Sequence, residues 1–393
     1  MTFEEIEQQE QRNMMPVFSR FPVALVSGKG ATAVGVDGKE YVDFTAGIGV
    51  NSLGYCDPEW SAAVAGQASA IQHLSNLYYS PVQTAAAEKL CELSGMSKVF
   101  FANSGAEANE CAVKLARKYG RDFLGSSCTE IVTLKNSFHG RTVTTLAATG
   151  QDEFHACFTP LTSGFSYAEP NMESVKSAVT EKTCAVLLEL IQGEGGVVPM
   201  PEPFVKELRA FCTEKKILLM VDEVQTGVGR TGAFYCYQNY GILPDVVTSA
   251  KGIASGLPLG ACLCAEPFAN VLGPGTHGST FGGNPVACAG ALVVLRRLAS
   301  PEFLSGVKAK GKYLSEKLAE MPGIACVRGM GMMIGAKPSH GAPGEIAGRC
   351  AERGLLILTA KDVLRLLPPL VITKEEADRG LAILREVLDT FKS

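Results

Sequence analysis

Six short apolar segments, separated by longer amphipathic stretches, constrain the fold of this chain more than any other feature of its sequence. They are KVFFA (98–102), EIVTL (130–134), CAVLLEL (184–190), ILLMVDEV (217–224), DVVTSA (245–250) and GACLCA (260–265). Segments that are apolar throughout, and not only at alternate positions, indicate strands buried on both faces. We therefore predict an α/β fold with a mostly parallel sheet wrapped by helices.

The N-terminal part of the chain has a different character. Residues 23–26 and 33–44 predict short strands, and Asp37 with Gly38 suits the tight turn of a hairpin.

The sequence changes again beyond Pro285. We predict long helices over 285–299, 304–320 and 374–391, and a strand region over 327–336. This pattern is typical of a smaller α+β unit. The predicted division is a segment 1–45 that packs with the small domain, a large domain 46–284 and a small C-terminal domain 285–393.

Composition and charge exclude several classes of protein. Of the 393 residues, 46% are apolar and 19% are charged, which is typical of a globular chain. The net charge is −4 and no long basic run occurs, so we expect no nucleic-acid partner. The first residues are acidic where a signal peptide is basic, and no apolar run is long enough to cross a bilayer. We expect a cytoplasmic protein without a membrane partner.

Thirteen cysteines are scattered singly through apolar surroundings, which indicates reduced, buried thiols. The one close pair, Cys262 and Cys264, would lie on the same face of a strand. No second pair or nearby histidine completes a zinc-binding set, and the five histidines lack the spacing of metal ligands. We predict no structural metal.

Ligands of open α/β sheets collect beyond the carboxyl ends of the strands, so the residues after each apolar segment carry the most functional information. After the first segment, Ser104 and Glu107 predict a capping box at the start of a helix. Gly105 and Ala106 leave the first helical amides open to a phosphate. An ordinary capped helix would have the same sequence pattern.

The loop after the second segment contains Phe138 and Arg141. An aromatic ring in a polar, glycine-containing loop is suited to stacking on a planar ligand, and an arginine can bind a carboxylate through two hydrogen bonds. A loop anchor and a solvated arginine are the equally compatible alternative.

Asp222 ends a buried segment, where an unpaired carboxylate is costly and calls for a cationic partner. Gln225 adds a hydrogen-bonding group close by. Lys251 follows the next segment and precedes a glycine, so burial would lower the pKa of its amine and make it a nucleophile. A surface lysine is the alternative for that position taken alone. Further on, Ser279 and Thr280 supply hydroxyls before a glycine-rich turn that also suits a phosphate.

These signals together describe one ligand. It has a phosphate, a flat ring, a ring nitrogen that needs a carboxylate, an acceptor for an amide and a carbonyl that reacts with an amine. Pyridoxal phosphate has all of these groups, and a carboxylate beside its nitrogen keeps the ring an electron sink.

Five motifs in order closely resemble those of the class III (ornithine-type) aminotransferases. They are NSGAEAN (103–109), SFHGRT (137–142), VDEVQTGVGRTG (221–232), TSAKGIASGLPLGA (248–261) and HGSTFGGNP (277–285). The resemblance covers nearly the whole chain, and within the family the chain is most similar to the acetylornithine type. It implies the pyridoxal-phosphate transferase fold type I, with a seven-stranded sheet, and a homodimer whose active sites lie at the subunit interface.

The resemblance also implies roles for single residues. Lys251 would bind the cofactor aldehyde and serve as the general base, Asp222 would pair with the pyridine nitrogen, and Gln225 would bond the phenolic oxygen. The implied cofactor-binding residues are Gly105, Ala106, Phe138, Asp222, Val224, Gln225, Lys251 and, from the neighbouring subunit, Thr280. The family usually has Glu-Pro where this chain has Glu189 and Leu190.

For the substrates, the resemblance implies that Arg141 holds the α-carboxylate of acetylornithine and Arg365 the α-carboxylate of glutamate. Glu194 would neutralise Arg365 while the first substrate is bound, and Ser279 would touch the amino-acid substrate. The implied reaction moves the distal amino group of N-acetylornithine to 2-oxoglutarate by a ping-pong mechanism, in arginine biosynthesis. Succinylornithine, ornithine and 4-aminobutyrate are the alternative amine donors.

Two other classes compete with this interpretation. Gly227, Gly229 and Gly232 form a G-x-G-x-x-G pattern, as in a nicotinamide-dependent oxidoreductase, but that fingerprint normally opens a helix after the first strand. The second competing class is a catalytically silent binding protein on the same fold. The presence of Lys251, Asp222 and both substrate-binding arginines argues against this class. We expect these glycines and Arg230 to shape a turn near the dimer interface.

Overall fold

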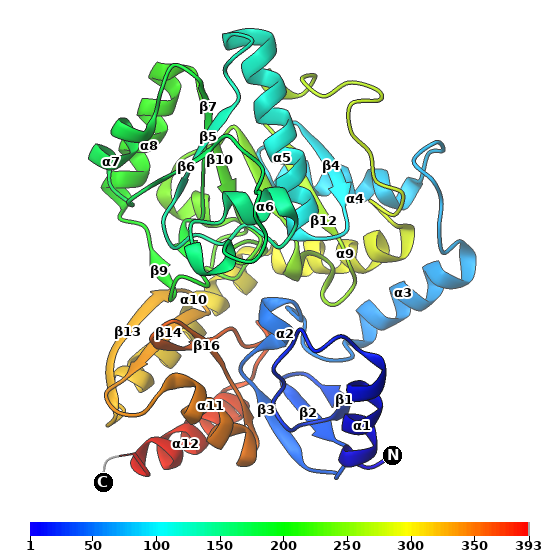
Figure 1. Cartoon of the computed structure of the whole chain (residues 1–393). Coiled ribbons are helices and arrows are strands. Elements are labelled where there is room, and N and C mark those ends of the chain that lie inside the picture. Colours follow the sequence, from blue (N-terminus) through cyan, green and yellow to red (C-terminus); the bar gives the residue numbers. More distant parts are fainter. Residues whose placement is uncertain (392–393) are drawn as a thin grey trace.

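The computed structural model describes residues 1–391, and a seven-stranded sheet is its largest element (Figure 1). In spatial order its strands are β4 (Lys98–Ala102), β12 (Gly260–Cys264), β11 (Val246–Ser249), β10 (Leu218–Asp222), β7 (Thr183–Leu188), β5 (Glu130–Leu134) and β6 (Phe165–Ala168). Only β12 runs antiparallel to its neighbours within this sheet. The predicted α/β fold with a mostly parallel sheet is confirmed.

Helices cover both faces of this sheet, which explains why its strands are apolar throughout. Along β10, Leu218 and Met220 belong to the core beneath α5 (Gly105–Tyr119), whereas Leu219 and Val221 belong to the core on the opposite face. The remaining helices of this part are α3 (Pro58–Ala70), α4 (Pro81–Ser94), α6 (Val143–Ala148), α7 (Met172–Ala178) and α8 (Glu202–Lys215). The next helix along the chain, α9 (Pro285–Leu298), packs against α3 and α4.

Two smaller sheets lie below the large one in Figure 1. One consists of β1 (Leu25–Lys29), β2 (Thr32–Gly35), β3 (Glu40–Asp43) and β15 (Leu355–Leu356). The other consists of β13 (Ile324–Met330), β14 (Met333–Pro338), β17 (Val363–Leu366) and β16 (Leu358–Ala360). The first sheet joins the two ends of the chain, because β15 pairs in parallel with β3.

The other elements frame these sheets. The helices of the terminal regions are α1 (Phe3–Asn13), α2 (Ala46–Gly49), α10 (Pro301–Ala319), α11 (Pro343–Glu352) and α12 (Lys374–Asp389). A two-stranded sheet, β8 (Ile191–Gln192) with β9 (Val198–Pro199), follows β7. Among residues 1–391 no helix is both long and apolar enough to cross a membrane.

The structure differs from the expectations in three elements. Strand β6 was not predicted, because it is a partly exposed edge strand and lacks a continuous apolar run. The segment 327–336 is part of two antiparallel strands, β13 and β14, that turn at Gly331, whose φ is +57°. The first strand, β1, begins at Leu25, two residues later than the predicted 23–26.

The cysteines follow the expectation only in part. All thirteen are free, and nine of them are buried, including Cys262 and Cys264, which share one core with α5. Cys56, Cys157 and Cys326 are exposed and correct the prediction, since apolar neighbours in sequence do not ensure burial in a loop or at a sheet edge.

Candidate active site

A cavity of about 400 Å³ lies beyond the carboxyl ends of the parallel strands, at the start of α5. Eight residues proposed from the sequence line it, and they come from four separate stretches of the chain. They are Gly105, Ala106, Phe138, Arg141, Asp222, Val224, Gln225 and Lys251. A cavity of this size suits one small ligand with a few convergent polar groups.

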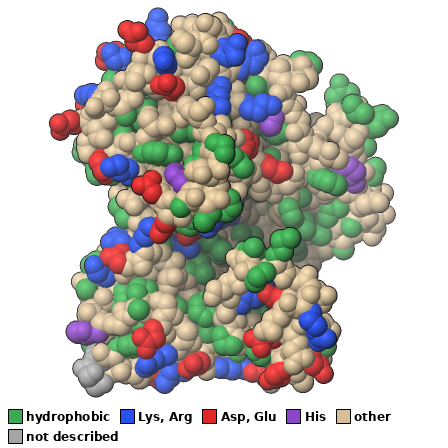
Figure 2. All heavy atoms as spheres, viewed as in Figure 1, with side chains coloured by type: hydrophobic (Ala, Val, Ile, Leu, Met, Phe, Trp, Pro, Cys, Tyr) green, Lys and Arg blue, Asp and Glu red, His purple; other side chains and the backbone are tan. Residues whose placement is uncertain are grey.

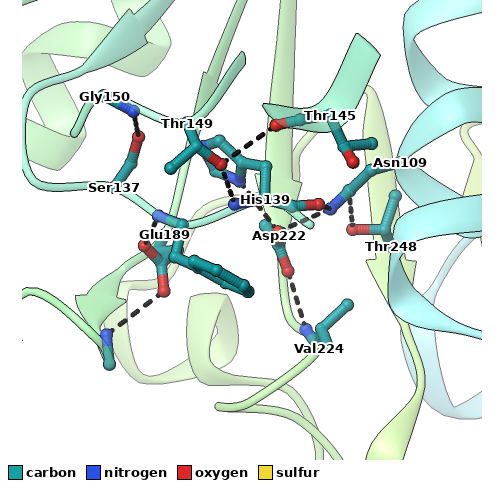
Figure 3. Close-up of polar contacts among 12 residues, drawn as sticks. Asn109, Ser137, His139, Thr145, Thr149, Gly150, Glu189, Asp222, Val224 and Thr248 are labelled. Carbon is teal, nitrogen blue, oxygen red and sulfur yellow. Dashed lines mark hydrogen bonds and ion pairs between the residues drawn. The ribbon is translucent and has the colours of Figure 1, made fainter. Parts of the chain in front are cut away.

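Asp222 is held at the end of β10 by a buried network (Figure 3). Its Oδ2 accepts hydrogen bonds from Asn109 Nδ2 and His139 Nδ1, both at 2.8 Å, and its Oδ1 accepts from the backbone N–H of Val224 at 3.0 Å. Asn109 is itself fixed, because Thr248 Oγ1 donates to its Oδ1 at 2.7 Å. The carboxylate therefore has one orientation at the cavity wall.

Sequence reasoning did not single out Asn109 and His139. Both side chains are almost completely buried and both lie inside motifs that were recognised, NSGAEAN and SFHGRT. A polar residue on the buried face of an otherwise apolar helix, such as Asn109 in α5, is the signal that could have identified them, because such a group requires a partner.

Glu189 supports the loop that carries Phe138. One carboxyl oxygen accepts from the backbone N–H of Phe138 at 2.9 Å and the other from that of Gly193 at 3.2 Å. Burial is the main cause that raises the pKa of Glu189 to about 7, and the nearby Asp222 raises it further. Leu190 is fully buried and leaves Glu189 in this position although it replaces the family's usual proline.

Lys251 occupies a strained backbone position directly after β11. Its φ is +43°, in the left-handed region that residues with a Cβ seldom adopt. Burial lowers the pKa of its amine, against the opposing effect of Glu194. The amine makes no hydrogen bond or ion pair with any residue between 1 and 391. A half-buried lysine without an ion-pair partner is suited to act as a neutral amine.

The start of α5 forms the opposite wall of the cavity. Ser104 Oγ caps the helix by accepting from the N–H of Glu107, at 3.2 Å. The Glu107 carboxylate reaches back to the N–H of Asn103 and not to that of Ser104, so the predicted capping box is displaced by one residue. A Cβ on Gly105 would lie 2.7 Å from Val224, so only glycine lets the helix approach this closely.

Arg365 and Glu194 form an ion pair beside the cavity. Strand β17 carries Arg365, whose guanidinium is almost fully buried, and the turn between β8 and β9 carries Glu194. Their charged atoms are 2.6 Å apart, and Arg365 also donates to Gln225 Oε1 at 3.1 Å. Burial raises the pKa of Glu194, but Arg365 outweighs burial and the pKa lies below its ordinary value.

Four residues predicted for the site do not line this cavity: Glu194, Arg365, Ser279 and Thr280. Thr280 is exposed, and Ser279 Oγ instead accepts from Gly282 N at 3.0 Å and from Asn103 Nδ2 at 3.2 Å.

The G-x-G-x-x-G pattern serves the packing of the chain and does not open a helix. Gly229 and Gly232 have φ values of +84° and +81° in a turn. Arg230 is fully buried and donates to the carbonyls of Met332, at 3.2 Å, and Pro368, at 2.6 Å. This turn therefore joins the end of the large sheet to the C-terminal part of the same chain.

The residues present fit pyridoxal phosphate. An oriented buried carboxylate, an amine whose pKa is lowered, a phenylalanine in the cavity wall and the open first amides of α5 all face one cavity of suitable size. These groups match the pyridine nitrogen, the aldehyde, the ring and the phosphate of that cofactor.

Comparisons with known proteins agree with this geometry. The family model of the class-III aminotransferases matches residues 14–388. The acetylornithine aminotransferase of Haemophilus ducreyi is 45% identical over 99% of both chains, and that of Aquifex aeolicus is 47% identical over 95% of this chain and 99% of its own.

Solved structures are similar as well. The N-acetylornithine aminotransferase of Stenotrophomonas maltophilia has a TM-score of 0.84 at 36% identity, over 98% of both chains. The ornithine aminotransferase of Toxoplasma gondii has a TM-score of 0.94 at 30% identity, over 99% of this chain and 96% of its own. The chain therefore belongs to the class-III aminotransferases, and it is an aminotransferase whose cofactor is pyridoxal phosphate.

Proposed function

We propose that this enzyme moves the distal amino group of N-acetylornithine to 2-oxoglutarate, giving N-acetylglutamate semialdehyde and glutamate, as a step of arginine biosynthesis. The observation that carries the proposal is the difference between two arginines. Arg141 lines the cavity and forms no ion pair within residues 1–391, whereas Arg365, which contacts the cavity residue Gln225, is paired with Glu194. The names of relatives 44–47% identical over nearly the full chain support it.

The cofactor, when bound, supplies a reactive carbonyl and an electron-withdrawing ring. Asp222 would hold the ring nitrogen, because His139, Asn109 and Val224 leave its carboxylate facing the cavity in one orientation. Gln225 would donate from its amide nitrogen to the phenolic oxygen, since its Oε1 already accepts from Arg365. Phe138 and Val224 would contact the ring, and Gly105 with Ala106 would hold the phosphate through their amides.

Lys251 would carry the proton during the reaction. An amine whose pKa is lowered by burial is unprotonated more often at neutral pH, so it can take a proton from the substrate carbon that bears the amino group. The strained backbone at Lys251 directs the side chain into the cavity from the end of β11.

The two arginines explain how one cavity would accept two different amine donors. N-acetylornithine has one carboxylate, far from its reacting amine, and Arg141 would bind it. Glutamate has an α-carboxylate next to its amine, and Arg365 would bind that group once Glu194 has moved away. With N-acetylornithine bound, Glu194 would keep Arg365 neutralised, so no charge is left unpaired.

We further propose a homodimer in which Thr280 of the partner subunit reaches the cofactor phosphate, and we propose that Ser279 touches the amino-acid substrate. Large apolar side chains are exposed in two loops, including Leu77 at 86%, Tyr79 at 97% and Phe281 at 60%. Figure 2 shows apolar side chains gathered toward the right of the view, where the loop between α3 and α4 lies in Figure 1. Exposed apolar surface of this kind marks a protein interface.

A cytoplasmic location is also proposed, and the support is the thiol chemistry: all thirteen cysteines are free, as expected in a reducing compartment.

An amine-donor panel tests the proposed substrate. The holoenzyme is assayed with 2-oxoglutarate and N-acetylornithine, N-succinylornithine, ornithine or 4-aminobutyrate, and N-acetylornithine should give the highest kcat/KM. Equal values for all four donors would reject the acetylornithine assignment.

Lys251→Ala tests the proposed base. The variant should lose at least 1,000-fold in kcat, because proton transfer by a positioned group contributes roughly 100- to 10,000-fold and the covalent link to the cofactor is lost as well. Its circular dichroism spectrum should match that of the wild type. Borohydride reduction followed by peptide mapping should place the cofactor on Lys251 in the wild type, and an adduct elsewhere would contradict this role.

A further inference from the structure

Two aromatic rings flank Arg141, and one of them, Phe154, belongs to none of the recognised motifs. The guanidinium carbon of Arg141 lies 4.3 Å from the centre of the Phe154 ring and 5.4 Å from that of Phe138. The two rings meet edge to face, with their centres 6.1 Å apart and their planes at 78°. These distances are within the range of cation–π contacts.

The backbone around Phe154 is fixed to the loop that carries Phe138. Phe154 ends a short 3₁₀ helix that spans Asp152–Phe154. Just before it, Gln151 Nε2 donates to the carbonyl of Ser137 at 2.9 Å, and Gly150 N donates to Ser137 Oγ at 3.0 Å. These hydrogen bonds fix the position of the Phe154 ring relative to Phe138, which lines the cavity.

The C-terminal part of the chain provides a second anchor for this short helix. Lys361 Nζ lies 2.6 Å from a carboxyl oxygen of Glu153, the residue before Phe154. Lys361 lies in the turn between β16 and β17, the strand of Arg365.

The way in which an arginine is held decides whether it can bind a substrate. A carboxylate occupies the N–H groups of a guanidinium and neutralises it, as Glu194 does to Arg365. An aromatic face holds the cation from above and leaves its five N–H donors free. Arg141 is exposed and has no acidic partner among residues 1–391, so its rings restrict the side chain without reducing its charge.

We propose that Phe154 is a positioning residue for the amine donor: its ring holds Arg141 ready to bind the carboxylate at the far end of the substrate from the reacting amine. This inference rests on the proposed function of Arg141. Phe154 touches neither of the reacting groups in this scheme, and it acts through Arg141. It thereby favours donors that bear a distal carboxylate over amines of the same length that lack one.

Phe154→Leu tests the proposal, because leucine keeps an apolar side chain but has no aromatic face. The KM for N-acetylornithine should rise about two- to fivefold, the size of one exposed cation–π contact, while kcat stays the same. N-acetylputrescine is the same molecule without the carboxylate, and its kcat/KM should not change. Phe154→Tyr keeps the ring and should restore the wild-type KM.

Phe391→Leu is the matched control. Arg349 lies over the Phe391 ring at the same 4.3 Å, near the C-terminus and outside the cavity. This variant should leave both kinetic parameters unchanged. Thermal unfolding of the holoenzyme verifies that each variant is folded.

Two results would overturn the proposal. The first is a KM for N-acetylornithine that Phe154→Leu leaves unchanged. The second is a decrease in kcat/KM for N-acetylputrescine as large as that for N-acetylornithine, which would indicate a packing effect alone. If the wild type rejects N-acetylornithine, the proposed substrate fails instead. The effect of Phe154 is then measured on a donor with a distal carboxylate that the enzyme does accept, beside the decarboxylated form of that donor.

Discussion

Adjacent carboxylates at the end of β10 are held by different partners. Asp222 faces the cavity and accepts three hydrogen bonds from Asn109, His139 and Val224. The next residue, Glu223, points away from it and accepts from Thr226 Oγ1 and from the backbone N–H of Tyr237, at 2.9 Å. Alternation along an extended segment places the first in the site and the second in the core.

Glu223 should give the stability of the enzyme a pH dependence. Burial raises its pKa from the ordinary 4.5 to about 7. Below pH 4.5 the carboxyl is protonated in the folded and the unfolded chain. Between pH 4.5 and 7 only the unfolded chain ionises, so the free energy of unfolding falls as the pH rises, and it levels off above pH 7.

Glu223→Gln removes this ionisation. The thermal unfolding midpoint of the wild-type holoenzyme should therefore fall relative to that of the variant as the pH rises from 4.5 to 7. Glu302→Gln, at an exposed position of α10, is the control, because water surrounds that side chain in both states. A difference for Glu223→Gln that does not vary with pH would contradict the prediction.

At the scale of elements, the antiparallel strand β12 and the start of α5 meet so closely that one position must be glycine. A Cβ on Gly260 would lie 2.3 Å from the carbonyl oxygen of Ser104, the cap of α5. The strand thus determines where the first amides of α5 lie.

Gly260→Ala should displace Ser104 and weaken cofactor binding. Overpacking of this kind costs about 1–3 kcal/mol, so the Kd of the apoenzyme for pyridoxal phosphate should rise about fivefold or more. Fluorescence titration measures the Kd. Gly66→Ala, in α3, is the control, because a Cβ there would contact nothing within 4 Å. Equal Kd values for the two variants would contradict this account.

Elements differed in how far the sequence predicted them. Strands such as β4 and β5 were predicted to the residue, because both carry a continuous apolar run. The edge strand β6 was not predicted, because hydrogen bonds to a neighbouring strand stabilise it without a continuous apolar run. The direction of β12 was not predicted either, because an apolar run does not encode the direction of a strand.

At the scale of the whole molecule, the site combines the large sheet with the C-terminal part of the chain, which supplies Arg365. We propose that the chain divides into the parts 1–45, 46–284 and 285–393, and the pairing of β3 with β15 supports the packing of the first part on the last. The ion pair of Glu194 with Arg365 then joins the large part to the small one.

Glu194→Gln should change the balance between the two amine donors. The variant frees Arg365, so the KM for glutamate should fall about tenfold, which corresponds to the ~1.4 kcal/mol of one hydrogen bond to a charged group. The KM for N-acetylornithine should not fall. Steady-state kinetics of both half-reactions measure these values, and a glutamate KM equal to that of the wild type would count against Glu194 as the residue that masks Arg365.

Leu77→Asp should disrupt the proposed homodimer, because it places a charge among the exposed apolar side chains between α3 and α4. Light scattering should give about twice 41.6 kDa for the wild type and a smaller mass for the variant. Phe123→Asp is the control, since Phe123 is 67% exposed beyond the far end of α5. A wild-type monomer would refute the dimer.

The sequence by itself determined six of the seven strands of the large sheet and eight of the side chains that line the cavity, because apolar runs and the residues that follow them are local patterns. Only the tertiary structure decided how those side chains are held. Asp222 meets Asn109 across 113 residues and Glu194 meets Arg365 across 171. Phe154 contacts Arg141 from a short 3₁₀ helix that belongs to no recognised motif. Such contacts depend on how separate elements pack. Only the folded chain therefore sets the pKa of Lys251 and decides which arginine has an acidic partner.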